Sequence, residues 1–193
     1  KTPLAADSIA EGPQPLPYSL ELQFRKPAIL DLLRSSNEPI WAEDRPATLV
    51  WLVVDDLAGR RLPLGDDETE LRQIVEASAA RRGLPLVWPV YDLQEQATLN
   101  LDSLWAADPA AIALASQRYD VSGTLLGRLL GTSDGKWRVA WEYNFSGTST
   151  YWDSECKMLA DCINGPINAV AELLSSRYAL ISTDQGDVAK VKI

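Results

Sequence analysis

The stretch that decides the fold is Thr48–Asp56, TLVWLVVDD. Its first seven residues are almost continuously apolar, and it ends on two adjacent aspartates, Asp55 and Asp56. A short apolar run without alternation predicts a strand that is buried on both faces, as in the centre of a sheet. The segments on either side of this strand are therefore read as the edges and the helical cover of that sheet.

A helix is expected downstream, after a turn over Leu57–Asp67. Asp66 or Asp67 can cap its first turn, with Glu70 as the capping-box partner. Gly83 then ends it, since glycine readily adopts the left-handed conformation that closes a helix. Apolar residues at helical spacing give this helix its core face: Leu71, Ile74, Val75 and Ala79.

The rest of the chain alternates in the same way. The strand Leu84–Trp88 is assigned to an edge because it contains Pro85 and precedes Pro89. A short helix is expected at Leu101–Trp105, and another begins at Asp108-Pro109. Three antiparallel strands follow with turns at Asp134-Gly135 and Gly147: Val121–Leu130, Lys136–Phe145 and Thr148–Trp152.

Further elements are expected toward the two ends of the chain. A short strand is expected at Leu20–Phe24, and Pro27 then opens a helix whose apolar face is Ile29, Leu30, Leu32 and Leu33. The closing helix is expected within Met158–Tyr178, and Gly165-Pro166 should break or delay it, so that its secure part is Ile167–Tyr178.

These elements predict an α/β (α+β) fold with a mixed sheet and helices packed on it, in the order β-α-β-α-β-α-β-β-β-α. Residues 1–17 are interpreted as a Pro-rich linker and residues 18–182 as a single domain. Residues 183–193 form a tail in which Val188, Val191 and Ile193 indicate a strand with no partner in this chain, read as the first strand of a missing domain.

Composition excludes several function classes. The chain has 193 residues and a net charge of -9, from 18 Lys+Arg against 27 Asp+Glu, which disfavours nucleic acids and anionic membrane surfaces. No apolar run approaches the length of about 18 residues that a membrane span needs. The chain has no histidine, which removes Ser/His and Cys/His catalysis and the usual zinc sites. We therefore lean away from an enzyme and expect no cofactor and no metal.

Clustered carboxylates are the first candidate site. Asp55, Asp56, Asp66 and Asp67 should gather at the end of the central strand, where α/β proteins commonly bind ligands. Such a group can hold a divalent ion or provide an acid and a base. An acidic loop followed by a helix cap explains the same residues without any chemistry.

Arg128 and the tryptophans are the second group of candidates. Arg128 lies in an apolar strand, where it can pair with a buried carboxylate, receive an anion or simply point into solvent. Of the seven tryptophans, Trp137 and Trp141 share one strand face with Tyr143, and packing under helices is favoured over a binding platform. Trp41 and Trp152 are expected to be more exposed and available to a partner.

Cys156 and Cys162 are close enough in sequence for a small disulfide loop. The alternative is two reduced cysteines, one of them buried in the closing helix. A thioredoxin-type site would need a two-residue spacer, which this pair lacks.

A set of motifs extends over most of Tyr18–Ile181: RPATLVWLVVDD (45–56), RGLPLVWPVYDL (82–93), LASQRYDVSGTLLGRL (114–129), GKWRVAWEY (135–143), PIW (39–41) and RYAL (177–180). Together these motifs resemble the bacterial envelope family known as domain of unknown function 2066. The resemblance implies an exported, periplasmic protein of a Gram-negative envelope and a longer parent chain. It supplies no catalytic or binding residue. The Ser149–Ile163 segment departs from the family pattern.

Two hypotheses follow. The first is a non-catalytic periplasmic module that docks on an envelope protein, for example through the edge strand near Pro85. The second is a carboxylate-based or divalent-metal-dependent hydrolase that uses the Asp55, Asp56, Asp66 and Asp67 cluster. The residues leave the oligomeric state open.

Overall fold

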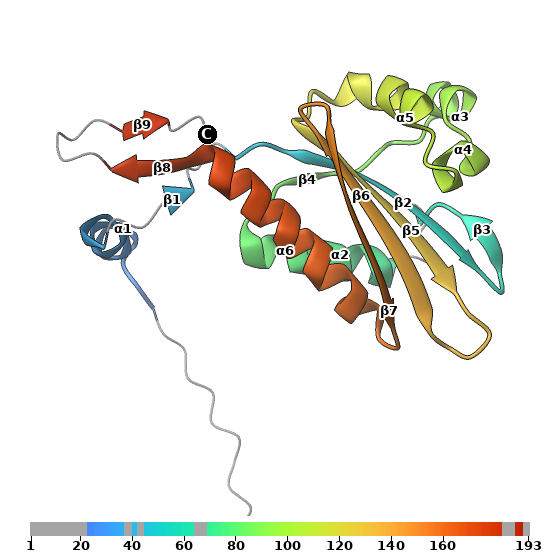
Figure 1. Ribbon diagram of the computed structural model, residues 1–193, viewed down its shortest axis with the longest axis horizontal. Coiled ribbons are helices and arrows are strands. Elements are labelled where there is room, and N and C mark those ends of the chain that lie inside the picture. The colour runs from blue at the N-terminus through green and yellow to red at the C-terminus, as the bar shows by residue number, and fades with distance from the viewer. Residues whose placement is uncertain (1–22, 37–39, 42–44, 64–68, 183–187, 191–193) are drawn as a thin grey trace, which may run out of the picture.

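The computed structural model describes residues 23–36, 40–41, 45–63, 69–182 and 188–190. It has the mixed sheet with packed helices that the sequence predicts (Figure 1). The larger sheet has six strands: β2 (Thr48–Asp56), β3 (Gly59–Arg61), β4 (Leu86–Val87), β5 (Gly123–Gly131), β6 (Trp137–Phe145) and β7 (Thr148–Cys156). Their order is β3-β2-β5-β6-β7, and β4 pairs with β2.

Strand β2 is central, as its continuous apolar run predicts. Residues 48 to 54 are all buried, and β2 runs parallel to β5 from the pair Thr48–Gly123 to the pair Asp55–Leu130. Strands β5, β6 and β7 then form an antiparallel meander. The turn between β6 and β7 places both Ser146 (φ 50°) and Gly147 (φ 76°) in the left-handed region, which matches a tight two-residue hairpin.

Helices cover the two faces of this sheet unequally (Figure 1). On one face, α2 (Thr69–Arg82) and α6 (Leu159–Tyr178) pack against residues of β2, β5 and β6. On the other face, α4 (Leu101–Trp105) and α5 (Pro109–Ser116) pack against Leu49, Trp51, Val53 and Leu126, which belong to β2 and β5, and α3 (Leu93–Thr98) contacts α5. We call the first the covered face. The second continues over β6 and β7 as the open face.

Helix α2 ends as expected at Gly83, whose φ of 61° is left-handed. The Leu84 amide donates to the Ala79 carbonyl and the Gly83 amide to the Ala80 carbonyl, which is the Schellman arrangement. Arg45 Nη1 donates to the Gly83 carbonyl at 2.6 Å. A Cβ at Gly83 would lie 1.6 Å from that Arg45 nitrogen, so a larger residue here would displace the Arg45 guanidinium as well as strain the left-handed backbone.

The expectation that Gly165-Pro166 breaks the closing helix is wrong. Helix α6 runs without interruption from Leu159 to Tyr178, with Pro166 inside it. Proline has no N–H for the carbonyl four residues earlier, which belongs to Cys162. That carbonyl instead accepts a hydrogen bond from the indole of Trp141, at 3.2 Å from Nε1. A tertiary contact therefore satisfies the group that Pro166 leaves unpaired, and the helix continues.

Three further expectations need correction. Phe24 lies in an irregular segment before α1 (Lys26–Ser35), so the strand expected at Leu20–Phe24 does not include it, and residues 20–22 lie outside the described part. The turn expected over Leu57–Asp67 contains strand β3, because Asp55 and Asp56 pair across a tight hairpin with Arg60 and Gly59. The third antiparallel strand extends beyond Trp152 to Cys156.

The C-terminal strand has a partner in this chain, contrary to expectation. It forms as β9 (Val188–Lys190) and pairs with β8 (Ala179–Ser182), which also pairs with β1 (Ile40–Trp41). These three short strands form a second sheet at the C-terminal end of α6 (Figure 1). The proposed linker at residues 1–17 lies outside the described residues.

Two of the motifs that carry the family resemblance meet around a buried carboxylate. Glu95, only 2% exposed, accepts hydrogen bonds from the Tyr91 amide and the Tyr119 hydroxyl. Arg118 Nη1 lies 3.4 Å from Glu95 and donates to Asp92 at 2.7 Å. Asp92 also caps α3 through the amides of residues 94 and 95. These residues hold helix α3 against the end of α5, which is a structural role.

Across the described ranges, none of the helices combines the length and the apolar character that crossing a membrane requires.

Candidate functional site

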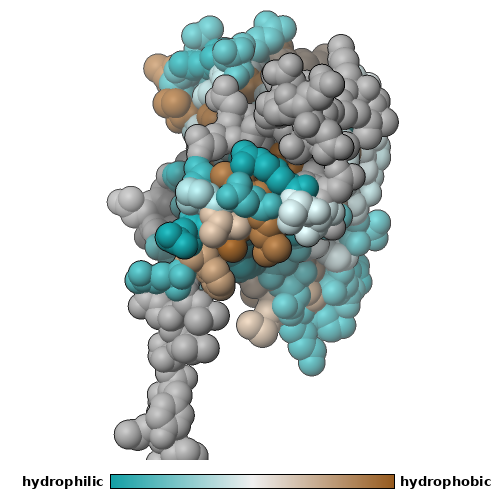
Figure 2. All heavy atoms as spheres, turned by 90° about the vertical axis from the view of Figure 1, so that its left-hand side faces the viewer, coloured by the Kyte–Doolittle hydropathy of each residue, from teal (hydrophilic) through white to brown (hydrophobic). Residues whose placement is uncertain are grey.

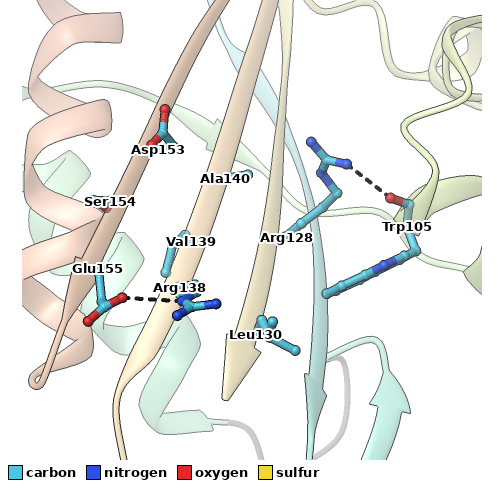
Figure 3. A pocket seen from close by; sticks show the side chains of 9 residues that line it. All are labelled: Trp105, Arg128, Leu130, Arg138, Val139, Ala140, Asp153, Ser154 and Glu155. Atoms are coloured by element: carbon cyan, nitrogen blue, oxygen red, sulfur yellow. Dashed lines mark hydrogen bonds and ion pairs between the residues drawn. The ribbon is translucent and has the colours of Figure 1, made fainter. Parts of the chain in front are cut away.

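A cavity lies on the open face, beside the C-terminal end of α4 (Figure 3). It has a volume of about 450 Å³. Figure 3 shows Trp105 and Arg128 along one side, Asp153 and Glu155 along the other, and the small side chain of Ala140 between them. The cavity exists because α4 covers β2 and β5 and then stops, while β6 and β7 continue without a helix above them.

Arg128 is held in place by the helix it faces. Its Nη1 donates to the Trp105 carbonyl at 3.1 Å, which satisfies an end carbonyl of α4. Trp105 is itself fixed by Arg60, whose guanidinium carbon lies 4.4 Å from the centre of the indole ring. Arg128 Nε is buried with no hydrogen-bond partner. Three roles were weighed for Arg128, and the structure shows neither a carboxylate partner among the described residues nor a fully exposed side chain. The third role, receiving an anion, stays a prediction.

The open face is organised in rows that cross the strands. Arg128 of β5 is directly opposite Ala140 of β6, and Ala140 is directly opposite Asp153 of β7. A cationic and an anionic side chain therefore occupy one row, two strand spacings apart, with a methyl group between them. Asp153 is exposed and makes no ion pair or hydrogen bond within the described ranges.

The neighbouring row is internally paired. Glu155 contacts Lys136 Nζ at 2.8 Å and Arg138 Nε at 3.2 Å. The hydrogen bond from Lys136, followed by that from Arg138, lowers the pKa of Glu155, and the same hydrogen bond to Glu155 raises the pKa of Lys136. These three side chains neutralise much of each other's charge, so Arg128 and Asp153 are the charges of the cavity that stay available.

The two described members of the predicted carboxylate cluster, Asp55 and Asp56, do not come together in one site. Asp55 and Asp56 point to opposite faces of β2, as adjacent strand residues do, and each is bound by an arginine of β3. Asp55 contacts Arg60 and Asp56 contacts Arg61, both at 2.8 Å. The hydrogen bond from Arg61 lowers the pKa of Asp56. Asp66 and Asp67 lie outside the described residues.

Metal ligation finds no support in the same region. Within the described residues, no three side chains of Asp, Glu, Cys or His gather closely enough to hold an ion. The Asp55 and Asp56 carboxylates already form short ion pairs, and an arginine beside a carboxylate opposes binding of a cation there.

The tryptophans belong mainly to the core. Trp141 and Tyr143 are 1% and 0% exposed and Trp137 is partly buried, which confirms packing under helices over a binding platform. Trp41 and Trp152 are half-buried against the same core cluster, so their expected exposure is only partial. The Arg45 guanidinium also covers the Trp41 ring, at 4.8 Å from its centre.

The structure joins Cys156 and Cys162 by a disulfide. Cys156 is the last residue of β7, and Cys162 is a buried residue in the first turn of α6. The bond therefore ties the end of an edge strand to the helix that covers the sheet.

Strand β7 provides the longest free edge of the larger sheet. It pairs with β6 over nine residues and with no strand on its other side in the described part of the chain. The edge near Pro85 is much shorter, because β4 has two residues, Leu86 and Val87. Prolines at both ends of that segment also remove hydrogen-bond donors. If a partner strand adds to this sheet, β7 offers the larger template.

A second exposed surface belongs to α1. None of its residues is buried, and Phe24, Ile29 and Leu32 are 69%, 36% and 60% exposed. Figure 2 shows hydrophobic residues grouped at this end of the molecule and framed by hydrophilic ones. Nothing in the described residues shows what covers this apolar face.

The sequence indicates Arg128 but not the other residues that complete the cavity. Most of these lie at alternate positions of β6 and β7, where polar or small residues alternate with the buried aromatic ones. That alternation was readable and indicates an uncovered face. Trp105 and its carbonyl could not be placed there from sequence. The missed residues are Trp105, Arg138, Ala140, Asp153 and Glu155.

Comparison with known proteins gives little further information. No family model matches the chain, and no curated protein matches it. Among solved structures, the N-terminal domain of Protein Y from Thermus thermophilus is 12% identical, over 67% of this chain and 93% of that chain, with a TM-score of 0.32. An uncharacterized protein is 12% identical, over 69% of this chain and 94% of that one, with a TM-score of 0.25. Similarity at this level supports no inference about function.

Proposed function

We propose that this chain is a non-catalytic protein-interaction domain of the Gram-negative periplasm, and that its partner adds a strand to the free edge of β7. The observation that carries the proposal is the nine-residue edge of β7, unpaired on its outer side within the described residues. An exposed strand edge presents a row of N–H and C=O groups to which an extended segment can bind.

Hairpin geometry identifies the groups that would bind. In a two-residue hairpin, the residues that flank the turn, here Phe145 and Thr148, pair closely through the backbone. Alternate residues then face outward, so Ser149, Tyr151, Asp153 and Glu155 direct their N–H and C=O groups away from β6. Their side chains lie on the open face.

The compartment is part of the proposal. The family resemblance implies an exported protein, and disulfides such as Cys156–Cys162 persist mainly in oxidising environments. The hydrolase alternative is not favoured by any observation on the described residues, since Asp55 and Asp56 are each bound by arginine on opposite faces of β2.

A photo-crosslinker tests the edge directly. A benzophenone amino acid in place of Tyr151, in the full-length protein in intact cells, should capture one dominant envelope protein. The same group at Leu114, an exposed position on α5, should not capture it. Ser149→Pro removes an outward N–H and should reduce capture at least fivefold while the melting temperature stays within a few degrees.

The matched control is Thr150→Pro, which removes an N–H directed at β6 and should lower the melting temperature strongly. Equal capture at positions 151 and 114, or capture that survives Ser149→Pro in a folded protein, would overturn strand addition at β7.

A further inference from the structure

We propose that the cavity of the open face binds a small linear zwitterion, with its anionic end at Arg128 and its cationic end at Asp153. The inference is independent of strand addition at the outer edge of β7. It starts from two opposite charges that share one cross-strand row and do not contact one another.

The anionic end of the ligand is assigned to Arg128 because the Nε of this guanidinium lacks a hydrogen-bond acceptor in the described part of the chain. A guanidinium has five N–H donors, and within the described residues Arg128 donates a hydrogen bond to the Trp105 carbonyl. Arg128 Nε is buried without an acceptor, which is a costly state for a charged donor. That single hydrogen bond also holds the side chain in place at the cavity wall. A carboxylate in the cavity would supply acceptors to a cation that is already oriented.

The cationic end is placed by Asp153. This carboxylate lines the same cavity and has no partner among the described residues, whereas its neighbour Glu155 is occupied by Lys136 and Arg138. Strands are spaced about 4.8 Å apart, so the backbone positions of Arg128 and Asp153 are separated by roughly 10 Å. In a linear molecule with an ammonium group at one end and a carboxylate at the other, the ammonium can therefore contact Asp153 while the carboxylate contacts Arg128.

The middle of the ligand is set by the apolar lining. Ala140 lies between the two charges in the row, and its methyl group leaves room that a larger side chain would fill. Leu130 and Trp105 add apolar surface beside it (Figure 3). A volume of about 450 Å³ suits a molecule with a short methylene chain. The chemical class is thus an ω-amino carboxylic acid.

Three matched probes test this assignment by calorimetric titration of the whole protein: 6-aminohexanoate, hexanoate and hexylammonium. We expect 6-aminohexanoate to bind at least tenfold more tightly than either of the others, because it alone engages both charges. Backbone amide signals of Arg128, Ala140 and Asp153 in an ¹⁵N-labelled sample should shift on titration.

Variants separate the two ends. Asp153→Asn should weaken 6-aminohexanoate at least fivefold and leave hexanoate unchanged, while Arg128→Gln should weaken both. Since Arg128 also caps α4, Ala140→Leu is the second test: it fills the cavity without removing a charge and should abolish binding in a protein that still melts cooperatively. Arg82→Gln, on α2 at the covered face, is the control and should change nothing.

Equal affinity for the three probes would overturn the zwitterion assignment. Unchanged 6-aminohexanoate binding in Asp153→Asn, or in folded Ala140→Leu, would place the binding elsewhere and overturn the site. Neither result depends on whether β7 captures a partner protein.

Discussion

Strand β6 has two sides that serve different purposes. Val139, Trp141 and Tyr143 are buried beneath α6, whereas Arg138, Ala140 and Glu142 alternate with them on the open face. The strand is the same, and the difference arises because α4 and α5 pack on β2 and β5 on that face. The comparison teaches that stability is concentrated on the covered face, while the charged groups available for recognition collect where the second helical layer ends.

The largest effect is expected on the covered face. Trp141→Ala should lower the free energy of unfolding by about 3–5 kcal/mol, through lost apolar burial and a cavity. Trp141→Phe keeps most of the apolar volume but removes the indole donor to the Cys162 carbonyl, so it should cost about 1–3 kcal/mol. Urea denaturation measures both. A negligible loss in Trp141→Phe would show that the hydrogen bond beside Pro166 contributes nothing.

Alkaline pH should probe the same face. Burial raises the pKa of Tyr143 to about 12, whereas an unfolded tyrosine titrates near pH 10. Below pH 10 both states are neutral and the full stability is present. Between pH 10 and 12 only the unfolded state loses the proton, so stability falls, by about 3 kcal/mol in all. Tyr143→Phe should show a shallower loss in urea midpoint over this interval, and an equal slope in both proteins would contradict the assignment.

Loss of the disulfide that joins strand β7 to helix α6 should have an intermediate effect on stability. Replacing both Cys156 and Cys162 by serine opens a short loop and should cost about 2 kcal/mol. Hydrogen exchange should increase at the end of β7 and the start of α6 more than in β2. Reduction of the wild-type protein should reproduce the change, and reduction of the variant should have no effect.

The smallest effect is expected on the open face at acid pH. The Lys136 hydrogen bond lowers the pKa of Glu155, so its contribution is present above about pH 4, the unfolded value, and is lost as pH falls through the lower folded pKa. Glu155→Gln should be slightly less stable than the wild type at pH 7 and equally stable at acid pH, so its acid dependence is shallower. A loss at pH 7 as large as that of Trp141→Phe would break the contrast between the faces.

Sequence predicted the central elements because their signals are local. The apolar run of β2, the Gly83 stop and the alternation in β6 each report burial or backbone conformation directly. The break expected in helix α6 was wrong because Pro166 predicts it locally, whereas the group that replaces the missing hydrogen bond, the Trp141 indole, lies in strand β6. The prediction that the C-terminal strand has no partner in this chain was wrong for the same reason, since the sequence did not indicate its partner, strand β8.

The candidate site was only partly predictable. Arg128 was visible as a charge in an apolar strand, but its neighbours come from α4, β6 and β7 and are assembled by register. The Asp55 and Asp56 hypothesis treated adjacent carboxylates as partners, while strand geometry sends them to opposite faces. Contacts set by pairing between distant segments could not be read from spacing along the chain.

The parallel pairing of β2 with β5 also implies an order of assembly. Thr48 meets Gly123 only after the intervening helices have closed a long loop, which is entropically slow, whereas β5, β6 and β7 join through tight turns. The meander is therefore expected to form early and to be completed later by β2. Until β2 pairs, we expect the apolar side of the meander and the β7 edge to be exposed together, which favours aggregation.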